Sequence, residues 1–366
     1  MSAQFLFRCA GTLALAWLAA AVCVWLRTPI PWMIGPLLAV SLASILGAPT
    51  RSWAPLRNAA QWTIGTALGL YFTAEVVALV TGLWWAIALA VAWALGLGVL
   101  FGRWLHRVNA LHFPGVPDDT LRATTYFAGA IGGASEMTLL AEKVQARTDL
   151  VAASHSMRLV IVTLAIPFAM QFSGLQGLDM LAPATRVVNA GGLALLAVLT
   201  GAGALLMRRL GRANPWFMGA LLVAMGLTMA GVSLSALPTW LSNVAQLVIG
   251  VSLGVRFTSE FIHTAPRWLG SVALGTLGMV VACAGFAWLL SWGTGLHWAT
   301  MVLSTSPGGI AEMAITAKVL QLGVPVVTAF QVSRLIAVLV LVEPLYGYTA
   351  ARRSRSQKNK THPEVR

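Results

Sequence analysis

Two short stretches of this sequence place an acid just after paired glycines, inside otherwise apolar surroundings. The pattern occurs as Gly132, Gly133 and Glu136, and again as Gly308, Gly309 and Glu312. Paired glycines can turn sharply, and a helix that starts after the turn points its positive end at an anion or at the glutamate. Both stretches are therefore predicted to line a path for a solute or an ion.

An arginine follows each glutamate at the same separation, Arg158 after Glu136 and Arg334 after Glu312. All four residues are predicted near the middle of a bilayer, where an ionisable side chain costs at least about 2.5 to 3.5 kcal/mol. Two interpretations remain open. The glutamates carry a proton or sodium ion while the arginines hold an anion, or each Glu–Arg pair is a neutral structural contact.

Three further polar residue types accompany these stretches. His155 lies one helical turn before Arg158 and is a candidate for a proton relay, although a lone histidine is more often a plain hydrogen-bonding residue. Gln331 holds the matching position in the second stretch. Ser135 and Ser306 lie beside the glycine turns and are candidate hydroxyl ligands.

Other chemistries find no support in the residue pattern. The six histidines show no metal-ligand spacing, and the three cysteines stand singly in apolar runs. A phosphate-binding glycine loop followed by lysine is missing, and no nucleophile and base stand in a recognisable arrangement. We expect a protein that is not an enzyme, with no metal and no cofactor.

The composition is that of a membrane protein. Apolar residues make up 58% of the 366 positions and charged residues only 10%, and the mean hydropathy is +0.79. Soluble domains carry about 25% charged residues, so most of this chain is predicted to lie in lipid. Apolar segments are expected at 9–26, 30–47, 58–75, 77–102, 123–142, 151–172, 186–207, 215–236, 240–258, 268–292, 298–320 and 324–348.

The second half repeats motifs of the first in the same order. Pro31-Trp32-Met33-Ile34-Gly35 returns as Pro215-Trp216-Phe217-Met218-Gly219, and Gly65-x-x-x-Gly69 returns as Gly250-x-x-x-Gly254, a spacing that mainly serves close helix packing. The Gly-Gly-x-x-Glu-Met motif is the third match. We predict a first membrane repeat at 1–180, a second at 181–350, and a basic tail at 351–366.

The distribution of Lys and Arg favours inverted repeats. If all the segments cross the bilayer, 13 of the 24 Lys and Arg fall inside and 9 outside. If the fifth and eleventh segments enter and return, the split becomes 19 inside and 3 outside, which agrees better with the positive-inside rule. The predicted fold is all-α, with two inverted repeats, about ten transmembrane helices and two re-entrant segments, as in secondary transporters.

Four motifs resemble the membrane AbrB family, whose members are often labelled ammonia monooxygenase or transcriptional regulator. They are Pro-Trp-Met-Ile-Gly-Pro-Leu-Leu at 31–38, Gly-Gly-Ala-Ser-Glu-Met at 132–137, Asn-Pro-Trp-Phe-Met-Gly at 214–219 and Ser-Pro-Gly-Gly-Ile-Ala-Glu-Met at 306–313. A metal monooxygenase would need clustered metal ligands, and a direct DNA reader would need a soluble recognition domain. The sequence offers neither, so we expect neither activity.

The residues favour a secondary transporter of a small solute coupled to an ion, proton or sodium. The alternative is a membrane protein that regulates gene expression indirectly, as a sensor. The net charge of +13 reflects topology rather than direct nucleic-acid binding, since the one dense basic cluster is the tail. We expect a bacterial inner (plasma) membrane, multi-pass, with both termini cytoplasmic, and a homo-oligomer is compatible with the sequence.

Overall fold

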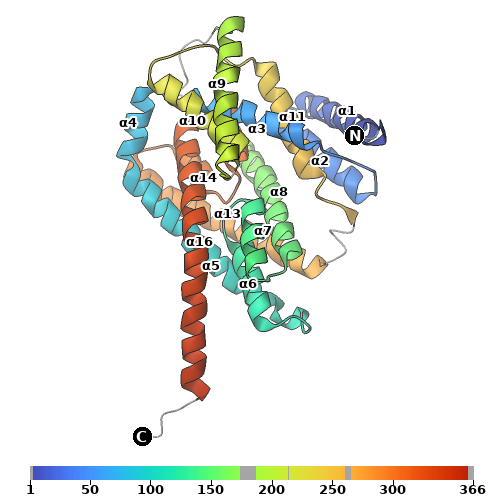
Figure 1. The fold of residues 1–366 in the computed structure, drawn as a ribbon, viewed down its shortest axis with the longest axis vertical. Coiled ribbons are helices and arrows are strands. Elements are labelled where there is room, and N and C mark those ends of the chain that lie inside the picture. Colours follow the sequence, from blue (N-terminus) through green and yellow to red (C-terminus); the bar gives the residue numbers. More distant parts are fainter. Residues whose placement is uncertain (1–2, 174–186, 213, 260–264, 362–366) are drawn as a thin grey trace. The chain divides into compact units, whose positions relative to one another are not determined.

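The structure, a computed structural model, describes residues 3–173, 187–212, 214–259 and 265–361, and within these ranges every regular element is a helix (Figure 1). By length and composition, six helices can cross a membrane, or up to seven if one bent pair counts as a span. The chain is therefore an all-α, multi-pass membrane protein. The six are α1 (Ala3–Trp25), α5 (Trp84–Asn109), α8 (Thr148–Phe172), α9 (Ala190–Arg209), α13 (Pro266–Thr294) and α16 (Val324–Thr361).

The chain forms two compact units. Unit 1 comprises Met1–Ala86 and Ser156–Gln331, and unit 2 comprises Ile87–His155 and Val332–Arg366. The boundary therefore passes through α8 just after His155 and through α16 just after Gln331, the two positions that the repeated motifs equate. The predicted repeats at 1–180 and 181–350 are defined by matching sequence motifs, whereas the two compact units are defined by contacts within the fold. The junction of the repeats lies outside the described residues, and the repeats stay a prediction.

Within unit 1, two pairs of shorter helices have matching lengths, and one of these pairs also has matching starts. α2 (Pro31–Ile45) and α10 (Pro215–Met229) both have 15 residues, begin with proline at the first position and follow a left-handed residue, Ile30 or Asn214. Proline suits a helix start because its missing N–H is not needed there. α3 (Ala54–Gly69) and α11 (Thr239–Gly254) both have 16 residues.

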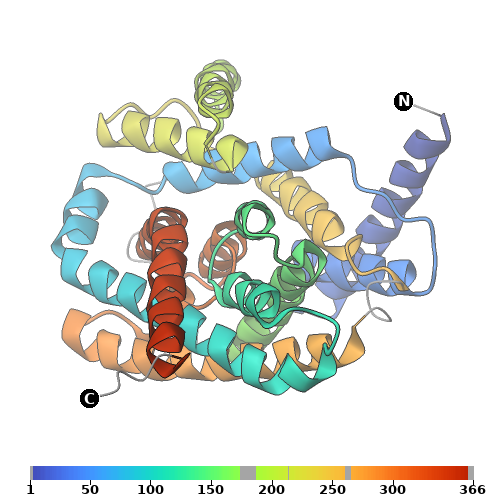
Figure 2. The ribbon, with the colours of Figure 1, turned by 60° about the horizontal axis from the view of Figure 1, so that its bottom comes forward.

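These four helices pack crosswise between the two halves of the sequence: α3 packs against α10, and α11 packs against α2 (Figure 2). A Cβ on Gly69 of α3 would lie 2.6 Å from the carbonyl oxygen of Leu221 in α10. A Cβ on Gly250 of α11 would lie 2.5 Å from the carbonyl oxygen of Met33 in α2. The packing role predicted for both glycine pairs is confirmed, because any larger residue would force the backbones apart.

The region after α3 differs from the prediction, which placed one uninterrupted helix at 77–102. A separate helix, α4 (Ala74–Gly82), comes first and is bent from α3 by 87°. The hydroxyl of Thr73 accepts a hydrogen bond from the Val76 N–H at 3.3 Å and so starts α4. Hydropathy cannot reveal such a bend, because the residues on both sides of it are apolar.

Two segments are broken where the sequence predicted glycine turns. The first broken segment consists of α6 (Asp118–Gly129) and α7 (Ala134–Lys143), and the second of α14 (Trp298–Thr305) and α15 (Ile310–Val319). A short helix starts directly after each glycine turn, as predicted, and α15 ends at Val319 with Leu320 as its C-cap. Whether either segment re-enters one side of a membrane stays a prediction.

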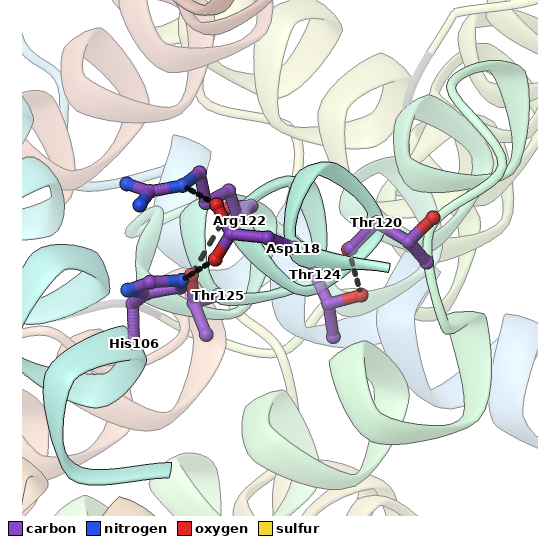
Figure 3. Close-up of polar contacts among 6 residues, drawn as sticks. All are labelled: His106, Asp118, Thr120, Arg122, Thr124 and Thr125. Atoms are coloured by element: carbon purple, nitrogen blue, oxygen red, sulfur yellow. Dashed lines mark hydrogen bonds and ion pairs between the residues drawn. The ribbon is translucent and has the colours of Figure 1, made fainter. Parts of the chain in front are cut away.

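An ion-pair cluster holds the start of the first broken segment (Figure 3). Nε2 of His106 lies 2.9 Å from Oδ1 of Asp118, and Arg122 donates from Nε to Oδ2. The Arg122 hydrogen bond is the largest cause of a lowered pKa for Asp118; partial burial opposes it, and His106 lowers it further. Thr124 then accepts the Arg147 N–H at 3.0 Å, which ties α6 to the turn before α8.

Candidate functional site

The start of α15 brings Glu312 onto its own glycine turn. Gly309 is the N-cap and Glu312 the third helical residue, the position from which an acid can fold back over a helix start. A Cβ on Gly309 would overlap with Oε2 of Glu312, so only glycine leaves room for this carboxylate. The side chain is buried, with 8% of the residue exposed. A carboxylate is thus held against free N–H groups inside the protein.

The start of α7 repeats this geometry in unit 2. Gly133 is the N-cap, and a Cβ there would overlap with Oε2 of Glu136. The surroundings differ, because Glu136 is only half-buried and the neighbouring Ser135 is exposed. The two sites therefore share a backbone arrangement but give their acids unequal contact with the surroundings.

The first glycine of each pair lies against a methionine side chain instead of the glutamate. A Cβ on Gly132 would lie 2.9 Å from Cε of Met137, and a Cβ on Gly308 would lie at the same distance from Cε of Met313. Both methionines are fully buried. The glycine pair and the Glu-Met pair of the motif thus match residue by residue, since one glycine accommodates the methionine and the other the carboxylate.

Gln331 donates hydrogen bonds to backbone carbonyls at the break in the second broken segment. In an unbroken helix the N–H of residue 307 would donate to the carbonyl of Leu303, but Pro307 has no N–H. Nε2 of Gln331 donates instead to Leu303 at 2.7 Å and to the carbonyl of Ser306 at 3.2 Å. Gln331 is fully buried, and within the described part of the chain its Oε1 has no hydrogen-bond partner.

His155 makes the corresponding hydrogen bond in unit 2. Its Nε2 lies 3.0 Å from the carbonyl oxygen of Phe127 in α6, the residue equivalent to Leu303. A carbonyl only accepts, so this bond requires the proton on Nε2. The side chain is 1% exposed. A role in stabilising the break therefore accounts for the buried His155, while its predicted place in a proton relay stays a prediction.

Three hydroxyls before the second turn bond within their own helix. Ser304 donates to Thr300 at 2.7 Å, Thr305 donates to Met301 at 2.9 Å, and Ser306 donates to Val302. All three hydroxyl residues are buried. Their protons are engaged, so toward a ligand these side chains act as hydrogen-bond acceptors.

Arg158 and Arg334 are both buried, with 3% and 6% of the residue exposed. Arg158 belongs to unit 1 and Arg334 to unit 2, whereas Glu136 belongs to unit 2 and Glu312 to unit 1. Each predicted Glu–Arg pair therefore joins residues of different units. The pairing, and with it the choice between an ion path and a neutral structural contact, stays a prediction.

Two further arginines are linked electrostatically to Glu312, Arg256 directly and Arg57 through Arg256. Arg256 is within electrostatic reach of both Glu312 and Arg57. Arg57 belongs to the first turn of α3, a helix that packs on both α11 and α15, and its Nε is buried with no hydrogen-bond partner among the described residues. We call Arg57, Arg256 and Glu312 the charged cluster. By residue type, the charged cluster has two basic side chains and one acid.

A signal for Arg57 was present in the sequence. Arg57, Gln61 and Gly65 follow at four-residue spacing, which places them on one face of α3. That face leads to the contact of Gly65 with Phe217 of α10. The apolar segment predicted at 58–75 begins one residue after Arg57, because a segment defined by hydropathy stops at the first charged residue.

Comparison with known proteins gives the family. Residues 32–350 match the family model described as transition state regulatory protein AbrB. The chain belongs to the AbrB family. The resemblance predicted from the four motifs is confirmed, and the match includes both broken segments.

Two AbrB-type relatives are similar over most of their length. The chain is 29% identical over 346 residues to “Uncharacterized protein YhjN” of Bacillus subtilis (strain 168), covering 87% of this chain and 86% of the relative. It is 25% identical over 331 residues to “Putative regulator AbrB” of Escherichia coli (strain K12), covering 85% of this chain and 88% of the relative. Neither name is that of an enzyme.

Proposed function

We propose that this AbrB-family protein is a secondary transporter that moves a small anionic solute coupled to an ion. The charged cluster carries the proposal. Two arginines grouped with a single glutamate have one formal positive charge in excess, which is costly in a lipid-solvated protein unless an anion balances it. An anionic solute that binds beside Arg57 and Arg256 would supply that balance.

The broken helix supports a binding role at the same place. Irregular backbone at membrane depth is tolerated only where protein buries it or where it lines a cavity, and transporters use such breaks to bind solutes and ions. The α14–α15 break offers a buried carboxylate, Glu312, and a buried unpartnered acceptor, Oε1 of Gln331. These oxygens suit a proton or a sodium ion as the coupling ion.

Alternating access would follow from inverted repeats. In our proposal the chain has about ten crossings and two re-entrant segments, α6–α7 and α14–α15, in a bacterial plasma membrane with both termini cytoplasmic. The equal lengths of α2 and α10, of α3 and α11, and of α7 and α15 support this duplication. In this proposal the repeat interface, formed by the reciprocal packing of α3 with α10 and of α11 with α2, lies beside the charged cluster.

The test is flux through the purified full-length protein in liposomes. Small carboxylates, phosphate and sulfate are supplied one at a time, with and without an imposed proton or sodium gradient. We expect gradient-dependent uptake of at least one anion. Arg256→Gln should lower that uptake at least about tenfold, the equivalent of about 1.4 kcal/mol, because one of the two charges facing the anion is lost.

The matched control is Arg267→Gln, an exposed arginine at the start of α13, which should leave uptake unchanged. Uptake of neutral or cationic solutes without any anion would overturn the anionic assignment. Uptake that is equal in Arg256→Gln and the unaltered protein would remove the charged cluster from the site.

A second candidate function is indirect regulation of gene expression, favoured by the printed name of the Escherichia coli relative. α16 continues as a helix through the basic residues up to Thr361, so a cytoplasmic partner would meet an ordered basic segment. Absence of flux across the whole panel, together with a transcriptional change on deletion of residues 351–366 in cells, would favour this function over transport.

A further inference from the structure

Unit 1 contains an apolar cavity at one end of α1. Its volume is about 180 Å³. One wall is a stripe of α1 residues at helical spacing, the facing wall comes from the chain just before and at the start of α3, and α11 closes the inner side. The wall residues that the argument uses are Leu6, Ala10, Leu13, Leu56, Val248 and Val251.

The cavity walls suit a hydrocarbon chain rather than water. A buried water needs two to four polar partners, and the walls named above are all aliphatic. Val248 and Val251 are 4% and 2% exposed, so the inner end is closed by packed side chains of α11. At about 30 Å³ for each water in the liquid, the space equals roughly six waters.

The polar lining residues are sequence neighbours. Arg51 and Ser52 come from the segment before α3, and Arg51 is exposed. Trp53 beside them is 36% exposed, as is usual for tryptophan at a membrane interface. The backbone N–H of Arg51 donates to Oγ1 of the buried Thr12 at 3.0 Å, which fixes this segment against α1. The backbone that carries Arg51 is thus fixed at the apolar cavity.

We infer that this cavity binds one acyl chain of an anionic phospholipid, with the headgroup phosphate on Arg51. The aliphatic walls take the chain and exclude water, while Arg51 supplies bidentate donors that match a phosphate in geometry and charge. A zwitterionic lipid with the same chains offers the same hydrocarbon but adds a cation that Arg51 repels. The site therefore selects by headgroup charge, and it is independent of the charged cluster.

Native mass spectrometry of the detergent-purified full-length protein tests the site. Phosphatidylglycerol and phosphatidylcholine with identical chains are titrated in parallel. We expect at least about tenfold stronger retention of phosphatidylglycerol, in keeping with the loss of a charged hydrogen-bonded partner. Arg51→Gln should reduce this preference to near unity. The matched control Arg107→Gln, an exposed arginine in the last turn of α5, should keep it.

A second variant separates the chain from the headgroup. Ala10→Trp fills the cavity from the exposed side of α1 and should abolish retention of both lipids while the thermal unfolding of the lipid-free protein is little changed. Equal retention of the two lipids by the unaltered protein would overturn the proposal. Retention of phosphatidylglycerol that survives both Arg51→Gln and Ala10→Trp would also overturn it, since the lipid would then bind elsewhere.

Discussion

The two broken segments use one backbone arrangement in unlike surroundings. In both, a glycine N-cap accommodates the carboxylate of the third helical residue, and a buried side chain bonds to a carbonyl that the break has freed. Around α15 the acid is buried and lies near Arg256, whereas around α7 the acid is half-buried and the adjacent serine is exposed. Burial separates the two copies, while their local geometry is alike.

This difference teaches that the motif itself is a way of ending and restarting a helix. Its chemistry depends on what surrounds the carboxylate. A half-buried glutamate keeps contact with the surroundings of the protein, whereas a buried glutamate is strongly coupled to neighbouring charges. We therefore expect the second broken segment to bind and the first to support the structure around it.

The largest expected effect comes from neutralising the two acids one at a time. Glu312→Gln should reduce gradient-driven anion uptake on the order of 100-fold, since the cost of an ionisable group in lipid, about 2.5 to 3.5 kcal/mol, is equivalent to that factor. Glu136→Gln should reduce uptake less than about tenfold. Flux in liposomes measures both, with Glu343→Gln as the control, because Glu343 is exposed and paired with Lys143. Equal losses in the two variants would break the comparison.

The next effect concerns the glycine N-caps. Gly309→Ala should destabilise the protein by about 1 to 3 kcal/mol, because the added Cβ displaces a buried carboxylate, and Gly133→Ala should cost less. The φ of −79° at Gly309 suits alanine, so the penalty is steric. Thermal unfolding in detergent measures both.

Two further variants control the glycine experiment. In a Glu312→Ala background, Gly309→Ala should cost little, since the carboxylate that it displaces is gone. Gly285→Ala in α13, where a Cβ meets open space, should be neutral or stabilise by about 0.5 to 1 kcal/mol. A Gly309→Ala protein as stable as the unaltered one would show that the carboxylate can move away freely.

The third effect concerns the side chains that serve the breaks. Gln331→Leu should cost about 1 to 3 kcal/mol, because it strands the buried carbonyls of Leu303 and Ser306. His155→Leu should cost a similar amount, since it strands the buried carbonyl of Phe127. The control is Gln171→Leu, an exposed glutamine bonded to the Arg27 carbonyl. A larger loss for His155 would indicate additional work by its second ring nitrogen.

The smallest effect lies at the starts of the two segments, which are held differently. α14 is capped by Nδ1 of His297, whereas α6 begins in the ion-pair cluster around Asp118. Asp118→Asn should cost less than about 1 kcal/mol, as is usual for exposed ion pairs. Because the folded pKa of Asp118 is lowered, its contribution is present at neutral pH and disappears as pH falls through that lowered pKa.

Unfolding curves between neutral and acid pH measure this contribution of Asp118 to the free energy of unfolding. The neighbouring acid Asp119 supplies the control Asp119→Asn, because Asp119 is exposed and takes no part in the ion pairs of Asp118. The unaltered protein and Asp118→Asn should converge in stability at acid pH. A difference that persists there would assign the effect to packing instead of charge.

The sequence predicted the parts of the site that depend on local backbone chemistry. Gly133 and Gly309 predicted the breaks, and the helices that follow them start directly after these glycines, as the motif predicted. The equivalence of His155 and Gln331 also emerged from the repeated spacing, and both side chains bond to equivalent carbonyls. Local rules sufficed, because each of these contacts is set by a turn and its neighbouring helix.

The parts that failed depend on packing between distant segments. Arg57 lay just outside the predicted segment at 58–75, because hydropathy cannot tell that α3 packs against both α11 and α15. The separate helix α4 escaped notice for the same reason, since its 87° bend changes direction without changing polarity. The unequal burial of Glu136 and Glu312 was equally invisible, because the two motifs are almost identical.

The crosswise packing of α3 with α10 and of α11 with α2 also constrains the order of biosynthesis. A ribosome completes α3 well before it makes α10, so the glycine face of α3 must wait unmatched in the bilayer. A nascent chain released before residue 215 would keep that face uncovered and should be a target for membrane quality control. Maturation of the N-terminal half is thereby tied to synthesis of the C-terminal half.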